Sequence, residues 1–195
     1  MSIKMIKQLL ATSVICAFAT SAMAADGTIS FTGEITSASC VISAGSGTTV
    51  GGSAGKQEIE VKLGKVSMDS LGSGSSAGIV GGTAINLNLD CGNTGTGLNT
   101  VSVNFDPMSG SGVDLANNSL LKTVGSAKGV GIGLYDVDSN LLNLSANQSF
   151  DGNLVKGADD KYSAILNLRA AYVANGEALE AGPADGTLPF TLTYK

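Results

Sequence analysis

The sequence predicts an all-β domain, an antiparallel sandwich of short strands. Short stretches in which apolar and polar residues alternate are separated by segments rich in glycine, serine, asparagine and aspartate, as in strands joined by turns. Glycine occurs 27 times in the 195 residues, which favours many turns. A parallel sheet needs amphipathic helices between its strands, and no long segment has the 3.6-residue apolar period of such a helix.

The first 24 residues are expected to be a cleaved signal peptide. Lys4 and Lys7 give a short positive region, an apolar stretch follows over 9–19, and Ala22-Met23-Ala24 has the A-x-A form of a cleavage site. The apolar stretch is shorter than the ~20 residues that a membrane-spanning helix needs. We therefore expect the mature chain to begin at Ala25 and to be exported.

Residues 25–39 are expected to be an N-terminal extension containing an amphipathic strand. One face carries Ile29, Phe31, Gly33 and Ile35, because every second side chain of a strand lies on the same face. The other face is polar throughout. An amphipathic strand at a free terminus is suited to insertion into another molecule, and the alternative is an ordinary first strand in its own sandwich.

Two cysteines, Cys40 and Cys91, remain after removal of the signal peptide. An even pair in an exported chain predicts a disulfide, which the loop-entropy estimate values at about 4 kcal/mol for a loop of roughly 50 residues. The alternative, a reactive thiol pair, lacks the C-x-x-C spacing of most redox sites.

The remaining elements follow in order along 40–195, the expected sandwich domain. A polar stretch over 43–55 predicts a loop, Ile59, Val61 and Leu63 predict a half-exposed strand, and 68–82 predicts a Gly/Ser-rich connection. Further strands are predicted at 84–91, 100–105, 129–137, 162–172 and 187–195, and one helical turn at 174–179. In the last strand Leu188, Phe190, Leu192 and Tyr194 share the inward face, unless 187–195 is simply the closing strand of a complete sandwich.

Taken together, these features resemble the subunits of chaperone–usher pili, most closely the major subunit of type 1-like fimbriae. The strand GTISFTGEI stands just before the first cysteine, and the second cysteine ends a strand of the form INLNLDC. Tyr194 is the penultimate residue, as the family's penultimate aromatic is, and Gly182 is fourteenth from the C-terminal end, where the family has a glycine. The resemblance covers both ends of the domain and its cysteine pair.

The resemblance implies an incomplete immunoglobulin-like sandwich that lacks its last strand and is completed by donor-strand exchange. Ile29, Phe31, Gly33 and Ile35 would enter the next subunit, and the acceptor groove, which also binds the chaperone, would include Gly182, Leu188, Phe190, Leu192 and Tyr194. The implied partners are other pilin subunits, a periplasmic chaperone and an outer-membrane usher. The implied location is a cell-surface fimbria reached through the periplasm.

Catalysis and cofactor binding are not expected. The sequence contains no histidine, which removes the usual general base and the commonest zinc ligand. Asp136–Asn140 begins like a calcium loop, but Leu141 stands where that loop needs glycine. The net charge of −5 disfavours nucleic-acid binding. We therefore expect no metal, no small-molecule cofactor and no enzyme; the alternatives to a shaft subunit are a minor adaptor or tip subunit, an adhesive binding module, or a secreted hydrolase.

Overall fold

A computed structural model describes residues 40–53, 56–72, 79 and 81–195 of the chain. The chain divides into two compact units, and every described residue belongs to the second, Thr36–Lys195. The expected signal peptide and the expected donor strand, with Ile29, Phe31, Gly33 and Ile35, lie outside the described residues. No helix within these ranges is long and apolar enough to cross a membrane.

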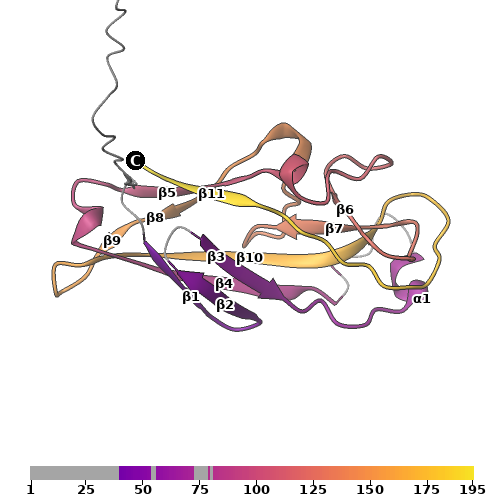
Figure 1. Cartoon of the computed structure of the whole chain (residues 1–195), viewed down its shortest axis with the longest axis horizontal. Coiled ribbons are helices and arrows are strands. Elements are labelled where there is room, and N and C mark those ends of the chain that lie inside the picture. The colour runs from indigo at the N-terminus through magenta and orange to yellow at the C-terminus, as the bar shows by residue number, and fades with distance from the viewer. Residues whose placement is uncertain (1–39, 54–55, 73–78, 80) are drawn as a thin grey trace, which may run out of the picture. The chain divides into compact units, whose positions relative to one another are not determined.

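The described part of the chain is dominated by antiparallel strands (Figure 1). They are β1 (Val41–Ala44), β2 (Thr48–Ser53), β3 (Lys56–Val61), β4 (Thr83–Gly92), β5 (Thr100–Phe105), β6 (Leu121–Lys122), β7 (Val130–Tyr135), β8 (Phe150–Asn153), β9 (Val155–Lys156), β10 (Tyr162–Ala174) and β11 (Phe190–Tyr194). The helical elements in these ranges are short: α1 (Met68–Gly72) and 3₁₀ turns at Asn93–Gly95, Pro107–Ser109 and Leu144–Ala146.

The strands form two principal sheets that face each other. The larger has the order β1-β4-β10-β7-β6, with β9 added beside β10, and the smaller has the order β11-β5-β8. Figure 1 shows β5, β8 and β11 as the upper layer, with β4 and β10 below. Strands β2 and β3 form a separate hairpin. The predicted all-β, immunoglobulin-like antiparallel sandwich is confirmed.

The core lies between the layers and is built from alternate positions of the long strands. On β4 the buried side chains are Ile85, Leu87, Leu89 and Cys91, as the alternation predicts. On β10 Leu166 is completely buried, while its neighbour Ile165 is 63% exposed on the outer face. Val101 and Val103 close the core from β5. Burial on one face only is what keeps each strand in a single register.

A disulfide joins Cys40, which precedes β1, to Cys91 at the end of β4, as predicted. Both cysteines are only 3% exposed and belong to the core cluster. The covalent link therefore holds the short first strand against the long strand with which it pairs.

Strand β7 carries two glycines, Gly131 and Gly133, on the face opposite to its buried Val130, Ile132 and Leu134. A side-chain carbon at Gly131 would approach Leu120 Cβ to 2.8 Å, and one at Gly133 would approach Leu141 Cδ1 to 3.0 Å. The first contact is closer than real side chains tolerate, and the second would require Leu141 to shift, so the glycines let adjoining segments cover the strand from its second face.

Two sequence predictions are wrong. The stretch 43–55, predicted as a loop, contains the end of β1 and all of β2, because Ser43 and Ala44 continue the pairing with β4 and Thr48–Ser53 pairs with β3. Pairing with β4 and β3 thus makes this polar, glycine-rich stretch a strand, although its composition favours a loop. The helical turn predicted at 174–179 is also absent, because β10 continues to Ala174 and Gly176 has a φ of 101°.

The last strand is shorter than the predicted 187–195. Its ladder begins at Phe190, since Pro189 has no N–H to donate. The carbonyls of Thr187 and Pro189 still accept hydrogen bonds from Ser111 N and Asp106 N.

Candidate functional site

The acidic side chains that the sequence singled out lie in a loop and form their bonds within it. No group of three or more histidine, cysteine, aspartate or glutamate side chains in the described residues could hold a metal ion. In the 136–140 loop, Asp136 Oδ1 accepts hydrogen bonds from Asp138 N and Asn140 N, and Asp136 Oδ2 accepts one from Asn140 Nδ2. These bonds, with the side-chain amide of Asn140 foremost, lower the pKa of Asp136. The carboxylate of Asp136 is thus hydrogen-bonded within the 136–140 loop and stabilises the turn of that loop.

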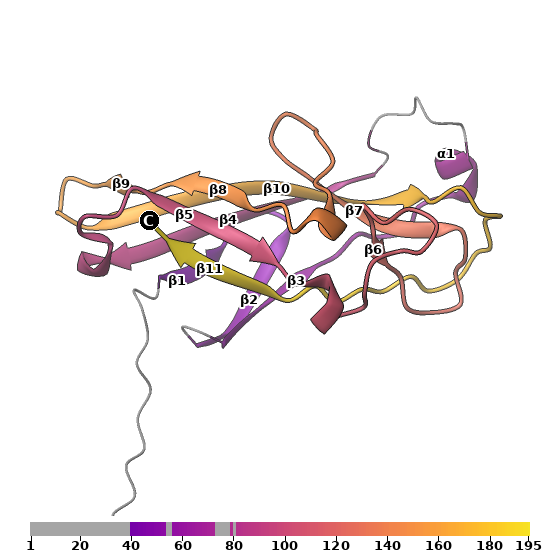
Figure 2. The same cartoon turned by 90° about the horizontal axis from the view of Figure 1, so that it is seen from above.

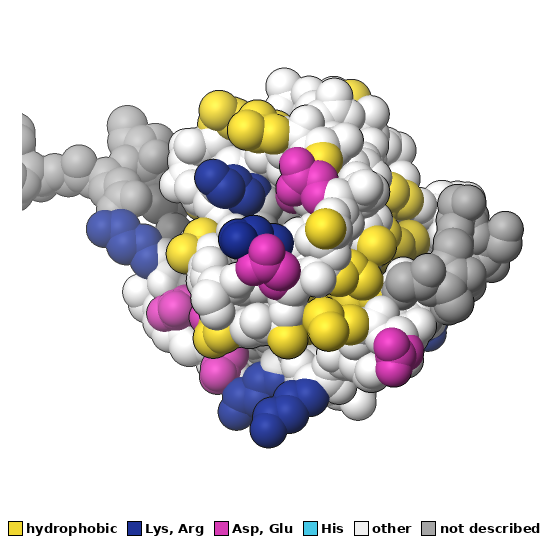
Figure 3. All heavy atoms as spheres, turned by 90° about the vertical axis from the view of Figure 1, so that its right-hand side faces the viewer, with side chains coloured by type: hydrophobic (Ala, Val, Ile, Leu, Met, Phe, Trp, Pro, Cys, Tyr) yellow, Lys and Arg dark blue, Asp and Glu magenta, His cyan; other side chains and the backbone are white. Residues whose placement is uncertain are grey.

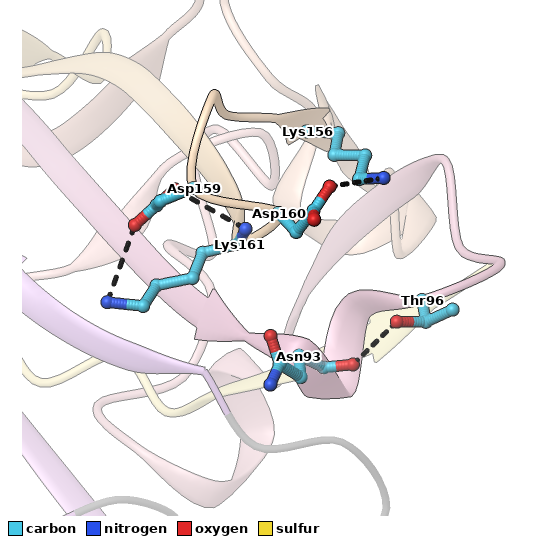
Figure 4. A network of polar contacts seen from close by, with 6 residues as sticks. All are labelled: Asn93, Thr96, Lys156, Asp159, Asp160 and Lys161. Atoms are coloured by element: carbon cyan, nitrogen blue, oxygen red, sulfur yellow. Dashed lines mark hydrogen bonds and ion pairs between the residues drawn. The ribbon is translucent and has the colours of Figure 1, made fainter.

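The acidic turn at 159–160 is also internally paired (Figure 4). Lys156 Nζ lies 2.7 Å from Asp160 Oδ1, and Lys161 Nζ lies 3.4 Å from Asp159 Oδ2. The side chain of Asp160 is 82% exposed, so the pair is a solvated surface contact of small energetic weight. A hydrogen bond from the Lys161 amide is the main reason that the pKa of Asp159 is lowered.

The feature that stands out is the outer edge of β11. This strand pairs with β5 on one side only and ends the smaller sheet. Lys195 N donates to Thr100 O, and Asp106 N donates to Pro189 O. Because bonded and non-bonded positions alternate along an antiparallel ladder, residues 189, 191, 193 and 195 direct their backbone groups toward β5, whereas Phe190, Leu192 and Tyr194 direct theirs to the outer edge.

The same alternation places the apolar side chains of this segment on the inner face. Leu188, Phe190, Leu192 and Tyr194 pack against the core cluster but are only half-buried. The structure thus brings together four of the residues predicted for the acceptor side. Among the described residues no strand pairs with this edge, so inward side chains and outward backbone groups of one strand are both left incompletely satisfied.

The chain before β11 is held by backbone hydrogen bonds to the stretch between β6 and β7. Val124 and Asp185 exchange backbone hydrogen bonds of 2.7 and 2.8 Å, and Lys128 and Glu180 exchange two of 3.1 Å. Lys128 Nζ adds an exposed ion pair to Glu180 Oε2 at 2.8 Å.

Gly182, the fifth residue predicted for the acceptor side, lies in this earlier segment and not beside the other four. A side chain at Gly182 would clash with Ser126 Oγ and with Ala127 N, because the glycine backbone packs directly on that turn. Its visible role in the structure is this close approach of two backbones.

Tyr172 on β10 anchors the same connection. Its hydroxyl donates a 2.8 Å hydrogen bond to Ala184 O. Partial burial, and secondarily the carboxylate of Asp185, raise the pKa of Tyr172. The neutral phenol is therefore the form that the fold favours.

The first strand, β1, is one edge of the larger sheet, and β6 is the other. Two side chains contact the side of β1 that faces away from β4. Ile42 N donates to Gln57 Oε1 at 3.0 Å, and Gln57 Nε2 donates to Ile42 O at 2.8 Å. Cys40 N donates to Tyr194 OH at 3.2 Å. Sequence reasoning missed Gln57, because a lone glutamine beside a polar stretch carries no pattern that predicts such a contact.

Gln57 belongs to the β2–β3 hairpin, which Figure 2 shows on the same side of the sandwich as β1 and β11. The inward face of the hairpin carries Val50, Ile59 and Val61, which pack against the core cluster. Figure 3 shows one end of the domain, where basic and acidic side chains occur in small separate groups with apolar side chains between them. Among its described residues, this end carries no large patch of a single charge.

Comparison with known proteins agrees with this architecture. Residues 29–195 match the family described as Fimbrial protein. The chain is 32% identical to the Long polar fimbria protein A of Salmonella typhimurium, with 100% of both chains covered. It is 31% identical to the Type-1 fimbrial protein subunit of Serratia marcescens, over 95% of this chain and 96% of the relative.

Solved structures share the fold at lower sequence identity. The P pilus rod subunit PapA matches with a TM-score of 0.50 and 21% identity, over 86% of this chain and 100% of PapA. A Burkholderia pseudomallei antigen and type I fimbria protein matches with a TM-score of 0.51 and 22% identity, over 80% of this chain and 97% of that chain.

Proposed function

The chain belongs to the fimbrial protein family, and we propose that this fimbrial subunit of the chaperone–usher type is a shaft component that polymerises by donor-strand exchange. The family consists of non-enzymatic structural subunits, so function here means assembly. The observation that carries the proposal is the outer edge of β11, where inward apolar side chains and outward backbone groups of the same residues have no neighbouring strand among those of residues 40–195 that the structure describes.

An added strand would satisfy both deficiencies at once. Its backbone would pair with Phe190, Leu192 and Tyr194, and its alternate side chains would cover theirs. The segment 25–39 has the required pattern, because Ile29, Phe31 and Ile35 alternate with polar residues. Burial of each large apolar side chain contributes about 1.5–3 kcal/mol, and each main-chain hydrogen bond about 0.5–1.5 kcal/mol.

Strand addition from one copy to the next gives a filament. The donor segment and the acceptor edge are different surfaces, so the contact is head-to-tail and need not close into a ring. We further propose that residues 1–24 direct export, that a periplasmic chaperone covers the β11 edge before assembly, and that an outer-membrane usher is where the exchange occurs.

The test exploits Gly33, where the proposal places a bare backbone on the apolar face of the donor strand. Gly33→Phe adds bulk to that face and is expected to abolish fibres seen by electron microscopy on cells that make the chain with its export partners. Ser30→Phe adds the same side chain to the polar face of the same strand and is expected to leave fibres in place. Normal fibres from Gly33→Phe would contradict the pairing scheme.

A shaft subunit and a minor adaptor differ in the number of copies that each fibre contains. The chain covers the full length of Long polar fimbria protein A. We expect many copies per fibre when isolated fibres are labelled with an antibody to this chain. Label confined to the fibre ends would contradict the shaft role and favour the adaptor.

A further inference from the structure

Within the part of the chain that the structure describes, side chains and no strand contact the outer edge of β1. Gly45 N donates to Asn86 O on β4, so residues 41, 43 and 45 direct their backbone groups toward β4, and residues 40, 42 and 44 direct theirs outward. The first two of these outward positions, 40 and 42, are the ones that Tyr194 and Gln57 contact. Two successive open positions of one edge are thus occupied by side chains from two other strands.

The carboxamide of Gln57 reproduces the hydrogen bonds of a paired strand. One carbonyl oxygen accepts from Ile42 N and one amide nitrogen donates to Ile42 O, which is the pattern a backbone residue on an adjacent strand would supply. No other neutral side chain except asparagine combines these groups, and asparagine is one carbon shorter.

The hairpin holds this carboxamide in place. Gln57 lies on the inward face of β3 together with Ile59 and Val61, which pack against the core cluster. Gln57 also pairs with Gly52 on β2. Gly52 has a φ of 87°, and a side chain at this position would clash with Lys56 O, so the position favours glycine. Apolar packing on one side and the ladder with β2 on the other fix the direction in which the side chain extends.

An uncovered β1 would be a hazard in a protein that assembles by strand addition. Val41, beside Ile42, is 52% exposed, so an uncovered β1 would present an exposed apolar side chain next to an open edge. Such an edge accepts strands without discrimination. A subunit whose partner carries a free amphipathic strand needs one edge that receives it and other edges that do not.

We propose that Gln57 is an edge guard, whose carboxamide closes β1 so that a partner strand is admitted at β11 only. The proposal rests on the proposed function, since the partner is a second copy of this chain that presents residues 25–39. The guard stays in place during assembly and directs where the strand pairs. A side chain that merely fills the space until the partner strand displaces it would have the opposite effect on assembly.

The first experiment removes the amide and keeps the bulk. Gln57→Leu in the full chain, produced with its export partners, is compared with wild type for fibre mass sheared from cells and for aggregated chain left inside. We expect the ratio of aggregate to fibre to rise roughly tenfold, the change that loss of two typical hydrogen bonds allows in the population of open β1 edges. The matched control is Gln148→Leu, because Gln148 Oε1 accepts from Asn143 N at 3.0 Å in a loop away from β1.

The possible outcomes are distinguishable. Unchanged fibre and aggregate would overturn the guard, and faster or more abundant fibre growth would overturn it in favour of a displaced stand-in. Gly33→Phe is measured in parallel: if it forms no fibres while Gln57→Leu behaves as wild type, the guard alone fails. If Gly33→Phe forms normal fibres, the proposed function fails.

A second variant covers the case in which Gln57→Leu does not fold. Gln57→Glu keeps the acceptor for Ile42 N but, when ionised, cannot donate to Ile42 O. Protonation below the ordinary carboxyl pKa of about 4.3 restores the donor. Repulsion between the ionised carboxylate and Ile42 O should open this edge, so hydrogen exchange at the Ile42 amide should be faster than in wild type at pH 7 and approach the wild-type rate near pH 4. A variant that differs equally from wild type at both pH values, or at neither, would overturn the proposal.

Discussion

Reduction of the Cys40–Cys91 disulfide should remove a large part of the stability of the free subunit. The bridge closes a loop with a sequence separation of 51 residues, which contains β1, the β2–β3 hairpin, α1 and most of β4. The loop-entropy relation gives about 4 kcal/mol at 25 °C for a loop of that length. Since domains are stable by about 5–15 kcal/mol, the bridge accounts for a substantial share.

Reduction is a cleaner perturbation than substitution because both buried sulfur atoms stay in the core. The mature chain carrying Gly33→Phe, in which strand exchange is expected to be blocked, is unfolded in urea with and without reductant. The free energy of unfolding should fall by about 4 kcal/mol on reduction. The slope with urea should rise, because the reduced unfolded chain exposes more surface.

The location of the bridge predicts where stability is lost first. The described pairing of β1 is with β4 on one side and with two side chains on the other, so β1 is held mainly by its tether and by β4. Hydrogen exchange after reduction should accelerate at Ile42 before it does at Leu166 in the core. A loss under 1 kcal/mol, with uniform exchange, would refute the reasoning that the bridge restrains the unfolded chain and anchors β1.

Two further predictions concern packing and pH. Gly152→Ala should destabilise the domain by about 1–3 kcal/mol, because its Cβ would clash with Cδ2 of the fully buried Leu166, whereas Gly51→Ala meets nothing within 4 Å and should be nearly neutral; equal melting temperatures for the two would contradict this. For Tyr172, the raised pKa means that folding favours the neutral phenol, so stability is full below the unfolded value of 10.0 and declines as pH rises above it. Tyr172→Phe should flatten that alkaline decline in thermal melts and lose the bond to Ala184 O, worth about 1 kcal/mol at neutral pH. A decline as steep as in wild type would show that other groups cause it.

The elements that sequence predicted best are those with one fully buried face. Strand β4 was predicted at 84–91 and β10 at 162–172, because alternate burial of long apolar side chains leaves a clear period of two. The disulfide was predictable from the cysteine count and the expected export of the chain. The four apolar residues of the last strand were placed on one face correctly for the same reason.

Features that depend on contacts distant in the sequence were missed. Of the β2–β3 hairpin, β3 was predicted from the alternation of Ile59 and Val61, but β2 was missed. Strand β2 is mostly polar and contains two glycines, so its local composition gave the signal of a loop. The pairing of Gln57 with Ile42 depends on how the hairpin folds back, and the position of Gly182 depends on the turn at 126–127. Such placements follow from tertiary packing, which overrides local propensity.

The wide separation of paired segments has a consequence for how the chain matures. Tyr194 OH meets Cys40 N across 154 residues of sequence, and β11 pairs with β5, which is synthesised long before it. A topology dominated by such distant partners folds slowly, since the loops must close before their contacts stabilise anything. The smaller sheet cannot be completed until β11 has been synthesised, although β5 and β8 are available much earlier. Completion of the sandwich is therefore a late event in the synthesis of this domain.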